Sequence, residues 1–132
     1  MLIEHKEEII WAAGFFDGEG CISFNKQKRK TCYSFRIDMS IGQKIADPLF
    51  VFSTLFGGTV SKQGENAFQW HLYGDNAANA LRLMLPYLKV KKQQAVIALK
   101  WTEVKKTFST LSERDIEGSK YHKHLKELKQ II

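Results

Sequence analysis

The strongest constraint on the fold is a run of alternating apolar and polar residues near the N-terminal end of the chain. Over residues 33–41 every second side chain, from Tyr33 to Ile41, is apolar, and a similar alternation begins at Ile22. Successive side chains of a strand point to opposite faces, so both segments predict strands with one apolar and one polar face. The basic residues at 26–30 are predicted to form the turn between them.

Periodicity and turn signals predict the remaining elements. A second hairpin is expected over 59–63 and 68–73. A helix is expected over 4–17, where Gly18 and Gly20 end it, and two others over 90–108 and 115–131. Two more helices are expected to begin after the predicted N-caps Asp47 and Asp75. This αββαββα order with extra C-terminal helices predicts an α+β fold, in which helices cover one face of a four-stranded antiparallel sheet. Residues 1–132 contain no linker, so we expect a single domain.

Charge and cysteine content limit the class of partner and the compartment. The net charge is +6, and residues 86–132 hold eleven Lys or Arg against five Asp or Glu. This balance favours an anionic partner such as nucleic acid, although basic runs are also common on solvated surfaces. No apolar run approaches the ~18 residues of a membrane span, so no membrane partner is expected. Cys21 and Cys32 form no disulfide framework, which favours an intracellular setting, either an organelle or the bacterial cytoplasm.

The polar face of the predicted sheet favours DNA as that partner. A face that only meets water usually carries many Lys and Glu, whereas this one is rich in Ser, Asn and Gln. Amide side chains match adenine and arginine matches guanine in the major groove, which admits a β-ribbon. Plain solvation stays open as the alternative. The predicted DNA contacts, including the basic turn, are Ser23, Asn25, Gln27, Lys28, Arg29, Lys30, Ser34, Arg36, Ser40, Ser61, Gln63, Gln69 and His71.

The segment AAGFFDGEG, residues 12–20, ends an apolar helix with two acids, Asp17 and Glu19. Carboxylates at a helix C-terminus are disfavoured by the helix dipole by about 0.3–1 kcal/mol each. The two acids therefore predict a compensating cation, either a metal ion or a lysine. On these grounds a metal site and a purely structural helix end are equal alternatives.

The same segment resembles the signature of the LAGLIDADG homing endonuclease family. Its direct matches are Ala13, Gly14, Asp17 and Gly20, and Glu19 stands at the final acidic position. The order of elements also matches the family core, and residues 87–100 resemble the segment that carries the family's active-site lysine. The resemblance implies a saddle-shaped sheet over DNA and, with a single motif copy, a homodimer.

The resemblance also implies an activity and a set of roles. It implies a site-specific double-strand DNA endonuclease that cuts a long, partly palindromic target with Mg²⁺, for which Mn²⁺ can substitute. The implied metal ligands are Glu19 and the carbonyl of Gly18, and Asp17 has a structural role. Gln43 corresponds to a residue that orients water, and Lys91 to one that stabilises charge on the phosphate. The implied dimer contacts are Trp11, Ala13 and Gly14.

Several points stay open at this stage. Gln43 and Lys91 could be surface residues, and Lys89 and Lys92 leave the register of the lysine open. Asp47 stands where the family often has a basic residue, with Lys44 as a candidate substitute. Two other functions compete with cleavage: a non-cleaving binder of the same fold, acting as a maturase or regulator, and an unrelated α+β interaction domain.

Overall fold

The computed structural model describes residues 5–131 and contains five α-helices and four strands. The elements follow the chain as α1 (Lys6–Glu19), β1 (Gly20–Lys28), β2 (Tyr33–Gln43), α2 (Asp47–Phe56), β3 (Thr59–Gln63), β4 (Ala67–Tyr73), α3 (Gly74–Met84), α4 (Lys92–Val104) and α5 (Leu111–Ile131). All strand pairs are antiparallel, and the order across the sheet is β1-β2-β4-β3. The predicted αββαββα order with additional C-terminal helices is confirmed.

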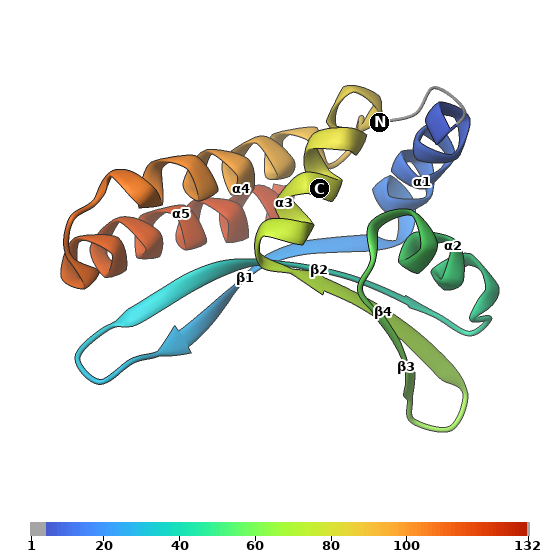
Figure 1. Cartoon of the computed structure of the whole chain (residues 1–132), viewed down its shortest axis with the longest axis horizontal. Coiled ribbons are helices and arrows are strands. Elements are labelled where there is room, and N and C mark those ends of the chain that lie inside the picture. The colour runs from blue at the N-terminus through green and yellow to red at the C-terminus, as the bar shows by residue number, and fades with distance from the viewer. Residues whose placement is uncertain (1–4, 132) are drawn as a thin grey trace.

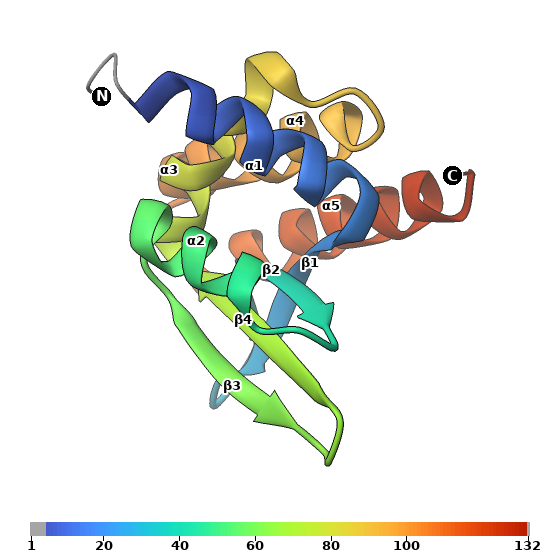
Figure 2. The same ribbon diagram turned by 90° about the vertical axis from the view of Figure 1, so that its right-hand side faces the viewer.

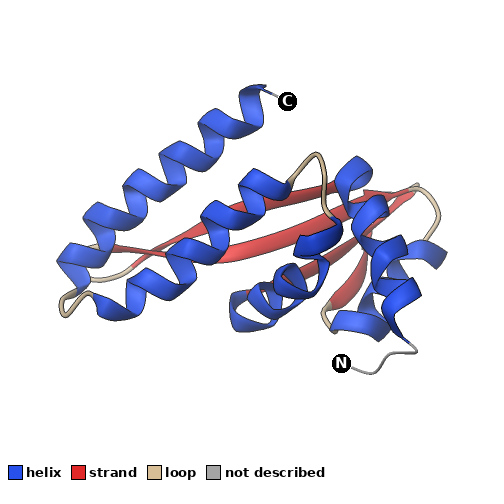
Figure 3. Ribbon diagram, turned by 90° about the horizontal axis from the view of Figure 1, so that it is seen from above, coloured by secondary structure: helices blue, strands red, loops and turns tan. Residues whose placement is uncertain are grey.

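The helices form one layer above a curved sheet, whose concave lower face is bare (Figure 1). Seen from above, α4 and α5 run side by side over the strands (Figure 3). The apolar side chains of the sheet and the helices form one buried core, including Ile22, Phe52 and Trp70. Within residues 5–131 no helix is both long and apolar enough to cross a membrane.

The predicted two-residue alternation of β2 is confirmed by its burial. Phe35, Ile37, Met39 and Ile41 are at most 4% exposed, and the residues between them lie on the other face. The hairpin is longer than predicted, because β1 continues to Lys28 and the turn falls at residues 29–32. Residues 26–28 contain no Gly or Pro that would break a strand. Of the predicted basic turn, residues 26–28 therefore belong to β1, and residues 29 and 30 lie in the turn.

Helix α1 is also longer than predicted at its C-terminal end. It runs through Gly18 to Glu19, and the chain becomes extended at Gly20. A Cβ atom at Gly20 would lie 2.2 Å from the ring of the buried Phe16. Close packing therefore explains Gly20. The predicted start of this helix, residue 4, lies outside the described residues.

Neither of the predicted aspartate N-caps is confirmed. Ala46 is the N-cap of α2, since its carbonyl accepts hydrogen bonds from the N–H groups of Leu49 and Phe50. Asp47 is the first residue of that helix, where its charge still complements the helix dipole. Helix α3 begins at Gly74, one residue before Asp75.

Helix α5 is fixed over the β1–β2 half of the sheet by close contacts. A Cβ atom at Gly118 would lie 2.4 Å from the ring of Phe35, so the helix approaches the sheet closely there. The His122 ring packs against the rings of Phe24 and Phe35, with centroids 6.3 and 5.5 Å apart. Burial, together with neighbouring lysines, lowers the pKa of His122 below its ordinary value. The lowered pKa favours the neutral imidazole in this half-buried aromatic contact.

Substitution of Gly118 by alanine tests this packing. In an open helix the change would be favourable, but here the added methyl overlaps the Phe35 ring. Overpacking costs about 1–3 kcal/mol, so we expect Gly118→Ala to lower the free energy of unfolding by about 1–2 kcal/mol in urea denaturation. Ser119→Ala, at the adjacent exposed position, is the control and should change it by less than about 0.5 kcal/mol. A stabilised Gly118→Ala variant would contradict the close packing.

Candidate functional site

The C-terminal end of α1 is joined to the start of α4 by three hydrogen bonds. The backbone N–H groups of Lys89 and Lys91 donate to the two carboxylate oxygens of Asp17, at 2.7 and 3.0 Å. The Lys91 Nζ atom donates in return to the carbonyl oxygen of Asp17, at 2.7 Å. Both oxygens of the Asp17 carboxylate are therefore occupied, and Lys91 is the lysine that reaches the end of the motif helix. Lys89 and Lys92 are exposed.

Glu19 lies at the same helix end in a different environment. Its Oε2 atom accepts one hydrogen bond, from Gln43 Nε2 at the end of β2, at 3.1 Å. Among the described residues no basic nitrogen lies within 4.0 Å of its carboxylate. The two acids of the motif thus differ. The carboxylate of Asp17 accepts two backbone N–H groups, and Lys91 binds the carbonyl of the same residue, whereas Glu19 is exposed and has no cationic partner.

The residues at this helix end are compatible with a hard divalent cation. Part of the Glu19 carboxylate is free, and the open space beside Gly18 leaves that turn accessible. Mg²⁺ prefers oxygen ligands and is commonly held by one or two carboxylates, with water and substrate phosphates completing the shell. Residues 5–131 contain no group of three or more His, Cys, Asp or Glu side chains that could hold a metal by themselves. A cation here would therefore need ligands from outside the chain.

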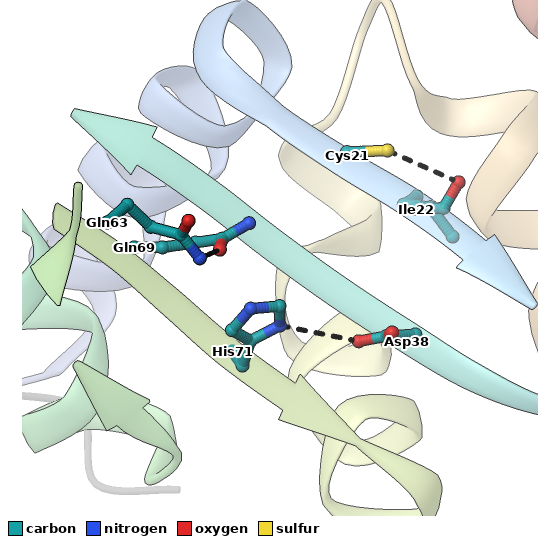
Figure 4. Close-up of polar contacts among 6 residues, drawn as sticks. All are labelled: Cys21, Ile22, Asp38, Gln63, Gln69 and His71. Atoms are coloured by element: carbon teal, nitrogen blue, oxygen red, sulfur yellow. Dashed lines mark hydrogen bonds and ion pairs between the residues drawn. The ribbon is translucent and has the colours of Figure 1, made fainter. Parts of the chain in front are cut away.

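Most of the predicted DNA contacts lie together on the open face of the sheet. Their positions alternate with the buried residues of each strand, and they are Ser23, Asn25, Gln27, Ser34, Arg36, Ser40, Ser61, Gln63, Gln69 and His71. Gln63 and Gln69 are hydrogen-bonded to each other across β3 and β4 (Figure 4). Arg29 and Lys30 lie in the turn after β1.

Lys28 does not lie on this face. It pairs with Tyr33 and shares the alternation of the buried Phe24, so its side chain lies on the helix side of β1. It lines a small hollow there together with Asp115 of α5. The extension of β1 into the predicted turn, as far as Lys28, explains this placement.

The sequence interpretation missed Lys105 and Arg114, which border the open face beside the predicted Arg29 and Arg36. A hollow of about 600 Å³ lies beside the first half of β2 and is lined by Arg29, Arg36, Lys105, Arg114 and the single acid Asp75. Burial is the main cause that lowers the pKa of Lys105 below its ordinary value; nearby cations add to the effect and Asp75 opposes it. Positive charge is therefore concentrated at this end of the sheet. Lys105 and Arg114 come from the C-terminal helices, and no sequence pattern places them near β2.

The outward side of α1 carries exposed apolar surface and open glycines. No other element lies in front of this helix when it is viewed from its own side of the molecule (Figure 2). Trp11 is 44% exposed and borders a hollow of about 590 Å³ between α1 and α2. Added Cβ atoms at Gly14 and Gly18 would meet nothing within 4 Å. Ala13 is different, because it is fully buried in its own core, and the prediction that it contacts a partner is wrong.

Comparison with known proteins identifies the class to which this fold and this helix end belong. Residues 12–108 match the family described as LAGLIDADG endonuclease. That range contains the motif, all four strands and the lysine segment. The chain belongs to the LAGLIDADG endonuclease family.

One relative in this family is the DNA endonuclease I-CvuI of Chlorella vulgaris. It is 28% identical to this chain over 99 residues, and the match spans 70% of this chain and 62% of the relative. A crystal structure of I-CvuI in complex with its target in the presence of Ca superposes with a TM-score of 0.85 at 23% identity, covering 96% of this chain and 85% of the other. The archaeal intron-encoded homing endonuclease I-Vdi141I, complexed with DNA, gives a TM-score of 0.77 at 18% identity over 94% and 85% of the two chains. These superpositions confirm the fold.

Because Asp17 and Glu19 lie in different environments, we expect their substitution to change the stability of the fold by different amounts. Asp17→Ala removes the acceptor of two backbone N–H groups, so we expect the free energy of unfolding to fall by about 1–3 kcal/mol. Glu19→Gln is the matched control at the same helix end, and it should change stability by less than about 0.5 kcal/mol. Urea denaturation followed by circular dichroism measures both. Equal losses in the two variants would contradict the assignment of a structural role to Asp17 alone.

Proposed function

We propose that this chain is one protomer of a homodimeric, site-specific endonuclease that cuts both strands of a long, partly palindromic DNA target with a divalent metal ion. The observation that carries this proposal is the exposed Glu19 carboxylate. It is held by Gln43, has no cationic partner among the described residues, and lies on the helix end that Lys91 also reaches. An acid without compensation at a helix C-terminus is costly unless a cation binds there.

Each side chain then has a role in phosphodiester hydrolysis. Glu19 and the carbonyl of Gly18 would hold Mg²⁺, or Mn²⁺ in its place, which supplies Lewis-acid stabilisation of the attacked phosphate and a lowered pKa of bound water. Gln43 orients Glu19 and nearby water through its amide. Lys91 places an ammonium group beside the negative end of α1, where it stabilises charge that develops on a phosphate.

The surface that would bind DNA is the open face together with the basic hollow at its end. The face presents donors and acceptors for base edges, and Arg29, Arg36, Lys105 and Arg114 supply positive charge for phosphates. The concave shape of the sheet suits a duplex lying below it (Figure 1). Relatives of the same fold, I-CvuI and I-Vdi141I, have been crystallised with DNA.

A homodimer follows from the chemistry and from the exposed side of α1. The motif end of one chain offers a single free carboxylate, whereas cutting two strands requires two reaction centres. Pairing α1 helices about a two-fold axis would bring both copies of Glu19 together and double the length of the reading surface. Trp11, Gly14 and Gly18 lie on the outward side, and the glycines would let the two helices approach closely.

Glu19→Gln tests the catalytic assignment. The isosteric amide keeps the shape of the helix end but loses the charge that holds the cation. We expect cutting of the DNA selected by the wild-type protein to be abolished in Mg²⁺ and in Mn²⁺, while the affinity for that DNA stays within about threefold, since the open face is unchanged. Gel electrophoresis of the cleavage products and fluorescence anisotropy measure the two quantities.

Glu103→Gln, which removes one exposed carboxylate from α4, is the control and should cut normally. Undiminished cutting by Glu19→Gln would overturn the assignment of Glu19. Tight binding by the wild-type protein without cutting in either metal would favour the non-cleaving binder instead.

Gly14→Leu tests the proposed dimer. The space around Gly14 is open in the single chain, so a leucine there should not disturb the fold of a protomer. In a dimer it would separate the two α1 helices. We expect sedimentation equilibrium to give twice the protomer mass of 15.2 kDa for the wild-type protein and a single protomer mass for Gly14→Leu.

Ser119→Leu adds the same side chain to an exposed position on α5 and should stay dimeric. A monomeric wild-type protein, or a fully dimeric Gly14→Leu variant, would place the interface elsewhere.

A further inference from the structure

The open face of the sheet contains a single acidic residue, Asp38. All other open-face positions of the four strands are neutral or basic. Asp38 lies at the centre of β2, opposite Ser23 on one side and Tyr73 on the other. It lines a hollow of about 370 Å³ in the face, together with Arg36 and His71. A carboxylate at this position repels DNA phosphates, so its presence on a DNA-binding face requires an explanation.

Among the described residues the carboxylate of Asp38 has one polar partner, the distant His71. Its Oδ1 atom is enclosed but accepts no hydrogen bond from any described residue. The nearest basic nitrogen is His71 Nδ1, 3.8 Å away on β4, which is beyond hydrogen-bond distance (Figure 4). The side chain as a whole is 22% exposed. The other oxygen, Oδ2, is not enclosed and has no hydrogen-bond partner among the described residues, so it can accept a hydrogen bond from a ligand in the hollow.

Arg36 lies two residues away on the same strand and the same face. Its guanidinium stacks on the ring of Tyr73, with Cζ 4.2 Å from the ring centroid, and its Nε atom has no hydrogen-bond partner among the described residues. Arg36 and Asp38 do not form a salt bridge with each other, although their Cα atoms are only about 7 Å apart along the strand. The hollow is therefore lined by a carboxylate and a guanidinium that both have hydrogen-bonding capacity unused by the described residues.

The edge of a C·G base pair complements this arrangement. In the major groove cytosine offers the N4 amino donor, and guanine, beside it, offers the O6 and N7 acceptors. Adenine also has an amino donor, but that donor lies between the N7 acceptor and the O4 acceptor of thymine, and both repel a carboxylate. Thymine offers no amino donor. A carboxylate next to an arginine therefore selects cytosine and its paired guanine.

We propose that Asp38 reads cytosine in each half of the DNA target, and that Arg36, stacked on Tyr73, reads the guanine paired with it. This inference rests on the proposed function, because it needs DNA on the open face. To that function the inference adds the base pair that is recognised and the acid that recognises it. This acid, Asp38, is separate from the proposed cleavage site at Glu19.

The test compares wild-type protein with Asp38→Asn in binding to a randomised duplex library. EDTA is present throughout, so that the DNA is not cut, and the retained duplexes are sequenced. We expect the wild-type protein to enrich cytosine at one position of each half-site. Asp38→Asn should lose this preference and gain adenine there, because an amide pairs with the N6 and N7 atoms of adenine.

A second measurement uses two duplexes that differ only by C·G or T·A at that position. The wild-type protein should bind the T·A duplex about tenfold more weakly, and Asp38→Asn should bind the two with similar affinity. Glu103→Gln removes one negative charge from the helix layer and should keep the wild-type ratio. Comparing the three proteins on the two duplexes distinguishes the loss of a contact with the base from a general change of charge.

Three results would overturn the inference. The first is an unchanged base preference in Asp38→Asn, and the second is an equal gain in affinity for both duplexes, which would show that Asp38 only repels phosphates. The third, enrichment of no sequence by the wild-type protein, would also refute the proposed function, whereas the first two leave that function intact.

Discussion

The contact between Asp17 and the start of α4 is the interaction on which the candidate site depends. It joins residues more than 70 positions apart in the chain, because one carboxylate accepts both backbone N–H groups and one lysine returns to the carbonyl of Asp17. This contact fixes the end of α1 against the helix layer. The next turn of the chain, with Glu19, is thereby directed toward Gln43 at the end of β2. Asp17 thereby positions Glu19, the acid that we propose holds the metal ion.

The two faces of the sheet carry different kinds of residue. Its helix side holds the buried core, and α5 is fixed to that side by Phe35, His122 and the close approach at Gly118. Its open side carries polar groups, and two of them, Arg36 and Asp38, have hydrogen-bonding capacity that the described residues do not use. Because the two faces alternate along each strand, a residue on the open side can change without loss of core packing. If the open face binds DNA as proposed, such a surface allows the DNA sequence that is read to vary while the fold is kept.

The fold could be predicted from the sequence because its signals are local. The alternation over residues 33–41 and the turn signals between elements predicted the strands and their order along the chain, and the residues of the motif indicated the family. The parts that failed depend on how elements meet in space. Ala13 and Gly14 are neighbours in sequence, but only the structure shows that Ala13 faces the core of its own chain. Lys105 and Arg114 reach the sheet through the packing of the C-terminal helices, which no short pattern encodes.

The measurement that tests the central claim most directly is cleavage of a randomised duplex library by the wild-type protein in Mg²⁺, with the ends of the products sequenced. The account predicts double-strand cuts with short overhangs at one long, partly palindromic sequence, because two copies of Glu19 would lie at the two-fold axis of a dimer. Products with cuts at unrelated sequences, or with only one strand cut in a site without palindromic symmetry, would contradict it.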